Sequence, residues 1–166
     1  MSPTPAVVLI GPMGAGKSRV GKRVAKNLDT GFIDTDSLIV ASNGPIAGIF
    51  DEHGERYFRE LERAVVADAL DSDAVVSLGG GAVLDPSTRE LLAKCRVAFL
   101  TVTAEAVEPR LAGGSRPLVR GGLADWERIF ADRLPIYQQL AGATFDTSRR
   151  PYTRIAEEVA QWAKQN

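Results

Sequence analysis

Short apolar runs alternate along the chain with longer segments whose apolar residues recur every three or four positions. Five runs are predicted to form short strands: 6–10, 31–34, 74–78, 97–102 and 143–146. The first is apolar and rich in β-branched residues, as is typical of a buried parallel strand. The periodic segments predict a helical turn over 37–41 and helices over 17–28, 45–50, 54–70, 87–94, 104–111, 126–140 and 152–164. Strands that alternate with helices predict an α/β fold of three layers, with a five-stranded parallel sheet between two helical layers.

Glycine and proline indicate where some of these segments end or break. Gly31 suits the end of the first helix, and Gly54 separates two helices within 45–70. Pro135 is expected to bend or restart the helix in which it stands. The stretch 113–122 is dense in glycine and arginine, which predicts a mobile cationic loop.

Composition narrows the class of protein. The chain has 166 residues, 45% hydrophobic and 25% charged, which is ordinary for one soluble globular domain, and we find no repeat or interdomain linker. A formal net charge of −1 gives no general attraction to nucleic acid or to an anionic membrane. No apolar run approaches the roughly 18 residues of a membrane span.

The single cysteine and the first residues bear on location. Cys95 has no second cysteine with which to form an internal disulfide or a zinc site, so a reducing cytoplasm is the simplest location. The N-terminus lacks the basic region of a signal peptide, and its apolar run 6–10 is short. We therefore expect the mature protein to begin here, inside the cell.

A phosphate-binding loop is the clearest chemical signal. Residues 11–18 read GPMGAGKS and match G-x-x-x-x-G-K-[ST] between a predicted strand and helix, the context that confirms a P-loop. Its backbone N–H groups and the helix N-terminus favour phosphate. We expect Lys17 to bridge the β- and γ-phosphates and Ser18 to ligate Mg²⁺. The alternative, an ordinary glycine turn, does not explain the full match.

Two carboxylates follow the second predicted strand. Asp34 and Asp36 point to one face if the backbone there is extended. One can then hold a Mg²⁺-bound water while the other accepts or orients a hydroxyl proton. Alternatively, Asp36 caps the following turn and Asp34 is merely solvated. The P-loop, this pair and the glycines 79–81 all follow strand ends, so we expect them to converge on one cleft.

Further motifs carry a family resemblance that runs from about residue 7 to 162. They are Asp34-Thr35-Asp36, Gly54-Glu55-x-x-Phe58-Arg59-x-x-Glu62, Gly79-Gly80-Gly81, Arg116-Pro117-Leu118 and Arg133-x-Pro135-x-Tyr137. With them the chain resembles the shikimate kinases. The P-loop is widespread among kinases, whereas the other motifs, in this order and spacing, are much more specific.

The resemblance implies a P-loop kinase that transfers the γ-phosphoryl group of ATP, with Mg²⁺, to the 3-hydroxyl of shikimate. It implies a single domain over 1–166, with a substrate-binding segment at about 34–62 and a lid at about 112–124. The implied catalytic residues are Lys17, Asp36 and Arg116. ATP would contact Gly14, Ala15, Gly16, Lys17, Ser18, Arg19, Arg110, Arg116, Arg150 and Pro151. Shikimate would contact Asp36, Phe58, Arg59, Gly79, Gly80, Gly81 and Arg133, and Mg²⁺ would contact Ser18 directly and Asp34 through water.

Arg59 and Arg133, the two arginines on the acceptor side, suit the carboxylate of shikimate, because a guanidinium forms charge-assisted, bidentate bonds to a carboxylate. Taken alone, Arg59 would instead be a surface charge that pairs with Glu55 or Glu62 at helical spacing.

Two other classes of protein share part of this pattern. A gluconate kinase or a nucleoside-monophosphate kinase shares the P-loop and lid without the combination of DTD, GGG and RPL. A non-catalytic nucleotide-binding regulator would not need the acceptor-side carboxylates and arginines. We expect a cytoplasmic monomer whose partners are ATP and shikimate rather than nucleic acid or membrane.

Overall fold

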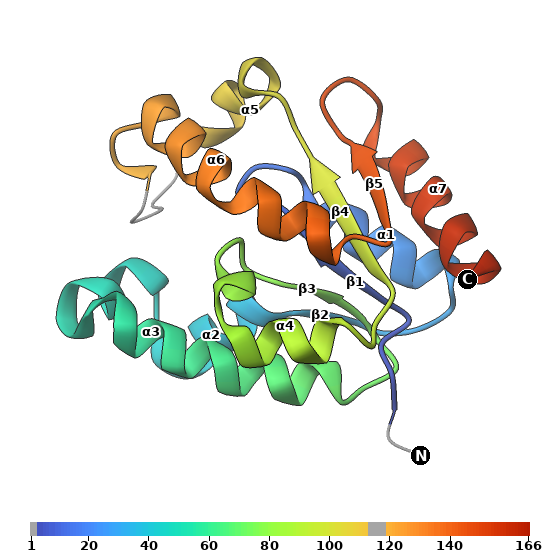
Figure 1. Ribbon diagram of the computed structural model, residues 1–166, viewed down its shortest axis with the longest axis horizontal. Helices are drawn as coiled ribbons and strands as arrows, with labels where there is room; N and C mark the ends of the chain where they lie inside the picture. Colours follow the sequence, from blue (N-terminus) through green and yellow to red (C-terminus); the bar gives the residue numbers. More distant parts are fainter. Residues whose placement is uncertain (1–2, 113–118) are drawn as a thin grey trace.

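The computed structural model describes residues 3–112 and 119–166. A parallel sheet of five strands in the order β2-β3-β1-β4-β5 lies at its centre (Figure 1). The strands are β1 (Val7–Ile10), β2 (Phe32–Asp34), β3 (Val75–Ser77), β4 (Val97–Thr101) and β5 (Ala143–Asp146). Each lies inside the segment predicted for it, which confirms the α/β fold.

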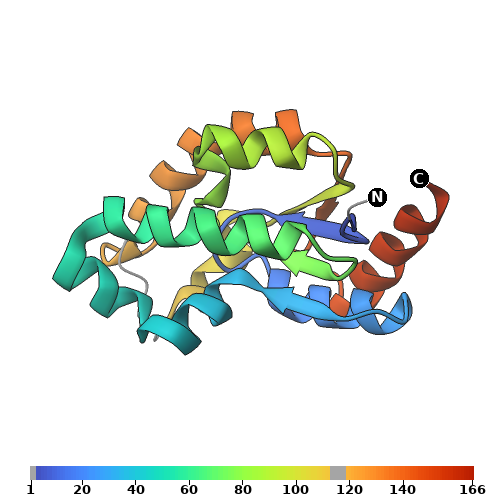
Figure 2. The same ribbon diagram turned by 90° about the horizontal axis from the view of Figure 1, so that it is seen from below.

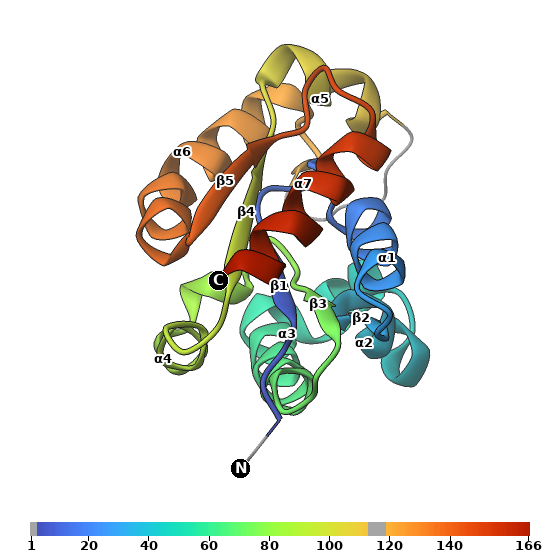
Figure 3. The same ribbon diagram turned by 90° about the vertical axis from the view of Figure 1, so that its right-hand side faces the viewer.

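Helices cover both faces of the sheet, as Figure 3 shows from the side. On one face pack α1 (Lys17–Asn27) and α7 (Tyr152–Gln165); on the other lie α3 (Ile46–Leu70), α4 (Pro86–Leu92) and α6 (Leu123–Leu140). Alternate residues of β1 enter the two cores: Val7 and Leu9 join the first, Val8 and Ile10 the second. Burial on both faces explains why the central strands β1, β3 and β4 read as largely apolar runs, whereas the edge strands β2 and β5 are only partly buried.

The remaining elements gather where the strands end. They are α2 (Thr35–Asn43), the 3₁₀ turn η1 (Ala82–Leu84) and α5 (Ala104–Leu111). In Figure 1, α2 and the first part of α3 form the lower arm, and α5 with the start of α6 forms the upper arm. Both chain termini lie at the other end of the molecule (Figures 1 and 2). The central part of the predicted lid and its Arg116 fall outside the described residues.

The end of α1 differs from the prediction. Asp29, not Gly31, adopts the left-handed conformation that ends the helix, with φ of 54°. The Asp29 N–H donates to the Lys26 carbonyl at 3.2 Å, and the Thr30 N–H donates to the Ala25 carbonyl at 2.9 Å. This is a Schellman arrangement, for which glycine is the usual residue, and aspartate is among the few others that adopt it.

The predicted break in the third helical region is confirmed. Gly54 has φ of 86° and ψ of 170° inside α3, so the first part of the helix turns toward α2 (Figure 2). By contrast, α6 continues through Pro135 without restarting. Among the described helices, none combines the length and the apolar character that a membrane span requires.

Candidate active site

A cavity of about 460 Å³ lies at the carboxyl ends of β1 and β3, beside the N-terminus of α1. The loop 11–16 forms its floor, and its shape depends on glycine. A Cβ atom at Gly11 would lie 2.2 Å from the Leu100 carbonyl oxygen, and one at Gly16 would lie 2.7 Å from the ring of Tyr152. Both glycines have positive φ, so other residues would also be strained. The cavity is lined by Met13, Gly14, Gly16, Lys17, Ser18, Arg19, Asp34, Asp36, Ser77, Leu78, Gly80, Arg110 and Tyr152.

The P-loop is held by hydrogen bonds from distant parts of the chain. Lys17 Nζ donates to the carbonyls of Gly11 at 2.8 Å and Pro12 at 3.0 Å, which keeps the ammonium at the loop. Arg110 Nη1 donates to the Gly14 carbonyl at 3.0 Å, and Thr147 Oγ1 donates to the Ala15 carbonyl at 2.7 Å. These partners come from α5 and from the loop after β5, so two distant segments of the chain hold the P-loop backbone in place.

Two residues that contact the P-loop, Thr147 and Tyr152, were not predicted from the sequence. Thr147 is fully buried, and Arg110 also donates to its carbonyl at 2.9 Å. Tyr152 lies against Gly16 and under the Arg110 guanidinium, 5.4 Å from Cζ to the ring centre. Neither Thr147 nor Tyr152 belongs to a motif, so their contacts become visible only in the folded structure.

Ser18 and Asp34 meet at the edge of this cavity. The Ser18 hydroxyl donates to Asp34 Oδ2, and Asp34 Oδ1 accepts the Ser37 N–H at 3.2 Å. Asp34 is therefore the N-cap of α2, and its position next to Ser77 in the sheet register fixes it at the strand end. One hydroxyl and one carboxylate oxygen are thus brought together at the P-loop.

Asp36 lies in the first turn of α2 rather than on an extended strand. The sequence alternative is wrong in its detail, because Asp34 makes the cap while Asp36 lines the cavity. Burial raises the pKa of Asp36, and the Asp34 carboxylate adds to this rise, whereas Lys17 and Arg59 oppose it. The two carboxylates take different directions because the chain changes from strand to helix between them.

A second, smaller cavity of about 120 Å³ adjoins the first. It contains all seven residues predicted to bind the acceptor, and three residues belong to both cavities: Met13, Asp36 and Gly80. Its complete lining is Met13, Asp36, Ile46, Phe50, Phe58, Arg59, Glu62, Gly79, Gly80, Gly81 and Arg133. The shared residues mark the point where a group can pass from one ligand to another.

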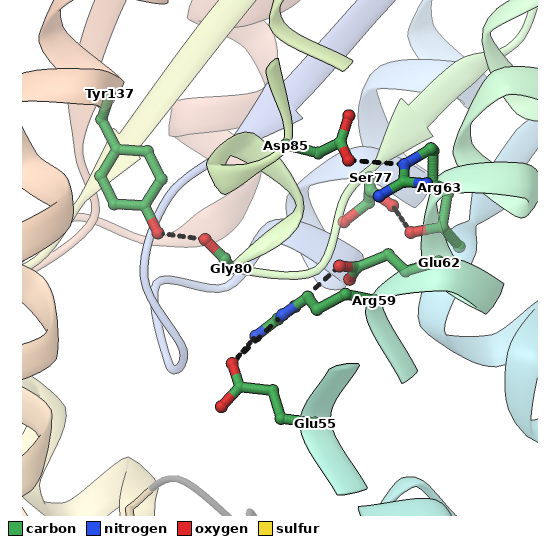
Figure 4. A network of polar contacts seen from close by, with 9 residues as sticks. Glu55, Arg59, Glu62, Arg63, Ser77, Gly80, Asp85 and Tyr137 are labelled. Carbon is green, nitrogen blue, oxygen red and sulfur yellow. Dashed lines mark hydrogen bonds and ion pairs between the residues drawn. The ribbon is translucent and has the colours of Figure 1, made fainter. Parts of the chain in front are cut away.

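Arg59 combines the two roles that the sequence left open. Its guanidinium donates to Glu62 Oε1 at 2.7 Å and to Glu55 Oε2 at 3.3 Å (Figure 4). It also lies on Gly81, where a Cβ atom would come within 2.4 Å of Nη2, and over the Phe58 ring at 5.2 Å. Arg59 is therefore paired on its own helix and still faces the acceptor cavity.

A hydrogen bond from α6 holds the glycine-rich turn after β3. Tyr137 Oη donates to the Gly80 carbonyl at 2.5 Å (Figure 4), and burial raises the pKa of Tyr137 to about 12. Arg133, one turn earlier on α6, is 7% exposed and lines the acceptor cavity. Trp126, from the same helix, donates to the Met13 carbonyl at 2.8 Å, so α6 supports both cavities.

Comparison with known proteins agrees with this geometry. The family model described as shikimate kinase matches residues 13–164. The shikimate kinase of Mycobacterium avium is 45% identical over 88% of this chain and 86% of its own length, and that of Thermobifida fusca is 44% identical over 97% and 96%. A solved shikimate kinase from Acinetobacter baumannii in complex with shikimate superposes with a TM-score of 0.93, at 30% identity over 99% of this chain and 94% of that one.

The chain belongs to the shikimate kinase family.

In this member of the shikimate kinase family, most residues predicted for ATP lie at the larger cavity. Gly14, Gly16, Lys17, Ser18, Arg19 and Arg110 line it, whereas Ala15 is fully buried beneath. Arg150 instead forms an ion pair with Glu158 along α7, and Pro151 is the N-cap residue of that helix; neither lines the cavity. Their predicted contact with ATP stays a prediction, as does the role of Arg116.

Glu62 belongs to the motif Gly54-Glu55-x-x-Phe58-Arg59-x-x-Glu62, and the sequence does not indicate a role for it. It is 3% exposed, and burial raises its pKa to about 7 against the opposing effect of Arg59. The signal that could have identified it is the spacing Arg59-x-x-Glu62, which places both side chains on one helix face. The same spacing is common on helix surfaces, so burial is what distinguishes this pair.

Proposed function

We propose that this chain transfers the γ-phosphoryl group of ATP to the 3-hydroxyl of shikimate, giving ADP and 3-phosphoshikimate. The observation that carries the proposal is the junction of the two cavities at Asp36 and Gly80. A triphosphate on the P-loop would point its terminal group toward this junction. An acceptor whose carboxylate meets Arg59 and Arg133 on the far wall would present its hydroxyl there.

Positioning and charge neutralisation would provide most of the catalysis, as is general in phosphoryl transfer. The P-loop N–H groups and Lys17 would bind the phosphates, and Arg116 would neutralise part of their charge. Asp36 would accept a hydrogen bond from the attacked hydroxyl and orient it toward phosphorus. As the new O–P bond forms and the β,γ-bridge bond breaks, the hydroxyl proton would pass to the Asp36 carboxylate.

The residues near Ser18 fit a magnesium ion. A hydroxyl and a carboxylate oxygen adjoin the phosphate cavity, and both are hard ligands of the kind that Mg²⁺ prefers. Among the described residues no group of three or more acidic, histidine or cysteine side chains could hold a metal by itself. This suits an ion that keeps several waters and takes the remaining ligands from phosphate. When bound, it would neutralise charge on the β- and γ-phosphates.

We also infer that the protein acts as a monomer in the cytoplasm. Both cavities are formed by one chain, so the described part of the site needs no residue from a second copy. The single cysteine suits a reducing compartment. Light scattering of the purified protein would test the first inference, with a mass of 17.8 kDa expected.

The decisive experiment measures ADP release with ATP and Mg²⁺ in the presence of shikimate, gluconate or a nucleoside monophosphate. We expect turnover with shikimate alone, with 3-phosphoshikimate identified by mass spectrometry. Turnover with another acceptor would retain the kinase and overturn the acceptor assignment. If no acceptor supports turnover, the alternative of a nucleotide-binding regulator takes its place.

A further inference from the structure

Glu62 presents a buried carboxyl oxygen whose purpose is not explained by its ion pair. Oε1 accepts the hydrogen bond from Arg59 Nη1 at 2.7 Å. Oε2 has no hydrogen-bond partner among the described residues, although the side chain is only 4% exposed. Leaving a buried carboxylate oxygen unpaired costs free energy, so such an atom calls for a proton or a ligand.

The unpaired oxygen and a carboxyl oxygen of Asp36 both lie close to Gly79. A Cβ atom at Gly79 would lie 2.9 Å from Glu62 Oε2 and 2.6 Å from Asp36 Oδ1. Two carboxyl groups, one from α3 and one from α2, thus approach the same point next to the acceptor cavity. A side chain at position 79 would displace at least one of the two carboxyl groups from this point.

The charges around Glu62 are nearly balanced before any acceptor binds. Arg59 faces it from its own helix, Asp36 from α2, and Arg133 and Tyr137 from α6. Lys17 acts on Asp36 from the P-loop side. An acceptor carboxylate would add a third negative group to the carboxylates of Asp36 and Glu62, and it would compete with Glu62 for Arg59.

We propose that Glu62 is a positioning residue that couples binding of the anionic acceptor to the uptake of one proton on its Oε2. The inference rests on the proposed function, because the acceptor is taken to carry a carboxylate. The proton comes from solvent and no other bond changes. The protonated Oε2 donates a hydrogen bond toward Asp36, and Glu62 becomes neutral, so Arg59 is released to pair with the acceptor.

The environment of Glu62 places its pKa within the physiological pH range, so the proton can be taken up there. Burial raises the pKa of Glu62 to about 7 in the empty cavity, with a further rise from Asp36, while Arg59 and Arg133 lower it. A bound carboxylate beside Arg59 would raise it further by like-charge repulsion. Near pH 6 the group already holds its proton, so binding takes up little; near pH 8 it is ionised, so binding takes up close to one proton.

Isothermal titration of the full chain with shikimate tests the coupling directly. At each pH, the titration is repeated in two buffers of different ionisation enthalpy, and the difference in binding enthalpy gives the number of protons taken up. We expect that number to rise from near zero at pH 6 to near one at pH 8. The affinity should fall about ten-fold over the same interval.

Two variants separate the proton from the ion pair. Glu62→Gln keeps an oxygen for Arg59 and a donor toward Asp36 but cannot titrate, so it should bind shikimate without proton uptake and with little dependence on pH. Glu55→Gln removes the other carboxylate that contacts Arg59, a side chain that is 47% exposed and screened by solvent. It should retain the proton uptake of the wild-type protein.

The outcomes distinguish this inference from the proposed function. If shikimate binds and the wild-type protein takes up no proton at pH 8, or if Glu62→Gln takes up as many, the role of Glu62 is wrong and the acceptor assignment stands. If shikimate does not bind at any pH, the acceptor assignment itself fails.

Discussion

At the scale of single residues, Arg133 is the buried cation of the acceptor cavity. We expect Arg133→Ala to raise the KM for shikimate by roughly 10- to 100-fold, because a hydrogen bond to a charged group contributes about 1.5–3 kcal/mol. The KM for ATP should stay within a factor of about two, since Arg133 does not line the larger cavity. Steady-state kinetics with each substrate varied in turn provides the measurement.

Arg133→Lys is the matched control, because it keeps the charge and loses the planar fork. It should recover part of the affinity for shikimate. A variant in which ATP binding weakens and shikimate binding does not would place Arg133 on the wrong side of the site.

The ionisation of Glu62 also predicts how stability depends on pH. Burial raises the pKa of Glu62 to about 7 in the folded protein, against 4.5 for an exposed glutamate. Because the pKa of Glu62 is raised in the folded state, its stabilising contribution to the free energy of unfolding is fully present below about pH 4.5. This contribution is lost as the pH rises through 7. The free energy of unfolding should therefore fall by up to about 3 kcal/mol across this window.

Urea unfolding at pH 5 and pH 8 measures this loss, and Glu62→Gln provides the comparison. The variant should lose clearly less stability than the wild-type protein between the two values. Asp36, whose pKa is also raised by burial, contributes in the same direction and remains in both proteins. Equal losses in the two proteins would show that Glu62 is ionised in the folded state throughout.

At the scale of secondary structure, the end of α1 carries an avoidable strain. Asp29 holds a positive φ, and its carboxylate lies at the negative end of the helix dipole. Asp29→Gly should raise the free energy of unfolding by about 1 kcal/mol, since glycine adopts this conformation without a steric penalty. Urea denaturation gives the value. Asp29→Ala removes the same charge but keeps the Cβ, so a gain as large as that of glycine would refute the conformational explanation.

Element boundaries show where sequence reasoning stops. Apolar runs located the three central strands, β1, β3 and β4, because strands buried on both faces are largely apolar. The edge strands β2 and β5 are only partly buried and each ends in an aspartate, so their apolar signal is weaker. The pattern did not show that α2 begins at Thr35, because the cap depends on Asp34 being fixed beside Ser77 by sheet pairing. As a result of this pairing, the Asp36 side chain lines the acceptor cavity, whereas the Asp34 side chain contacts Ser18. The motif identified both Asp34 and Asp36 from the sequence, but only the tertiary structure shows that their side chains point in different directions.

At the scale of the whole molecule, strand order could be expected only in outline. Alternating strands and helices predict a parallel sheet whose ligand site lies at the carboxyl ends, and the P-loop identifies which strand end holds phosphate. The contacts of Arg110 with Gly14 and Thr147 join residues far apart in sequence, so no local pattern contains them. The acceptor residues were identified through family resemblance, because single arginines and glycines have common structural explanations.

The proposal that residues 1–166 form a single domain can be tested with the two tryptophans. Trp126 lies buried under the P-loop and donates to the Met13 carbonyl, whereas Trp162 lies on α7 against Phe145. Trp126→Phe and Trp162→Phe each leave one fluorescent reporter. If one cooperative core joins the two regions, fluorescence and circular dichroism should give the same urea midpoint within each variant. If the Trp162 signal changes while the Trp126 region stays folded, the C-terminal helix and its neighbours form a separate unit.

Loss of the indole hydrogen bond should lower the midpoint of Trp126→Phe, and this shift alone does not affect the comparison, because the two probes are compared within one protein.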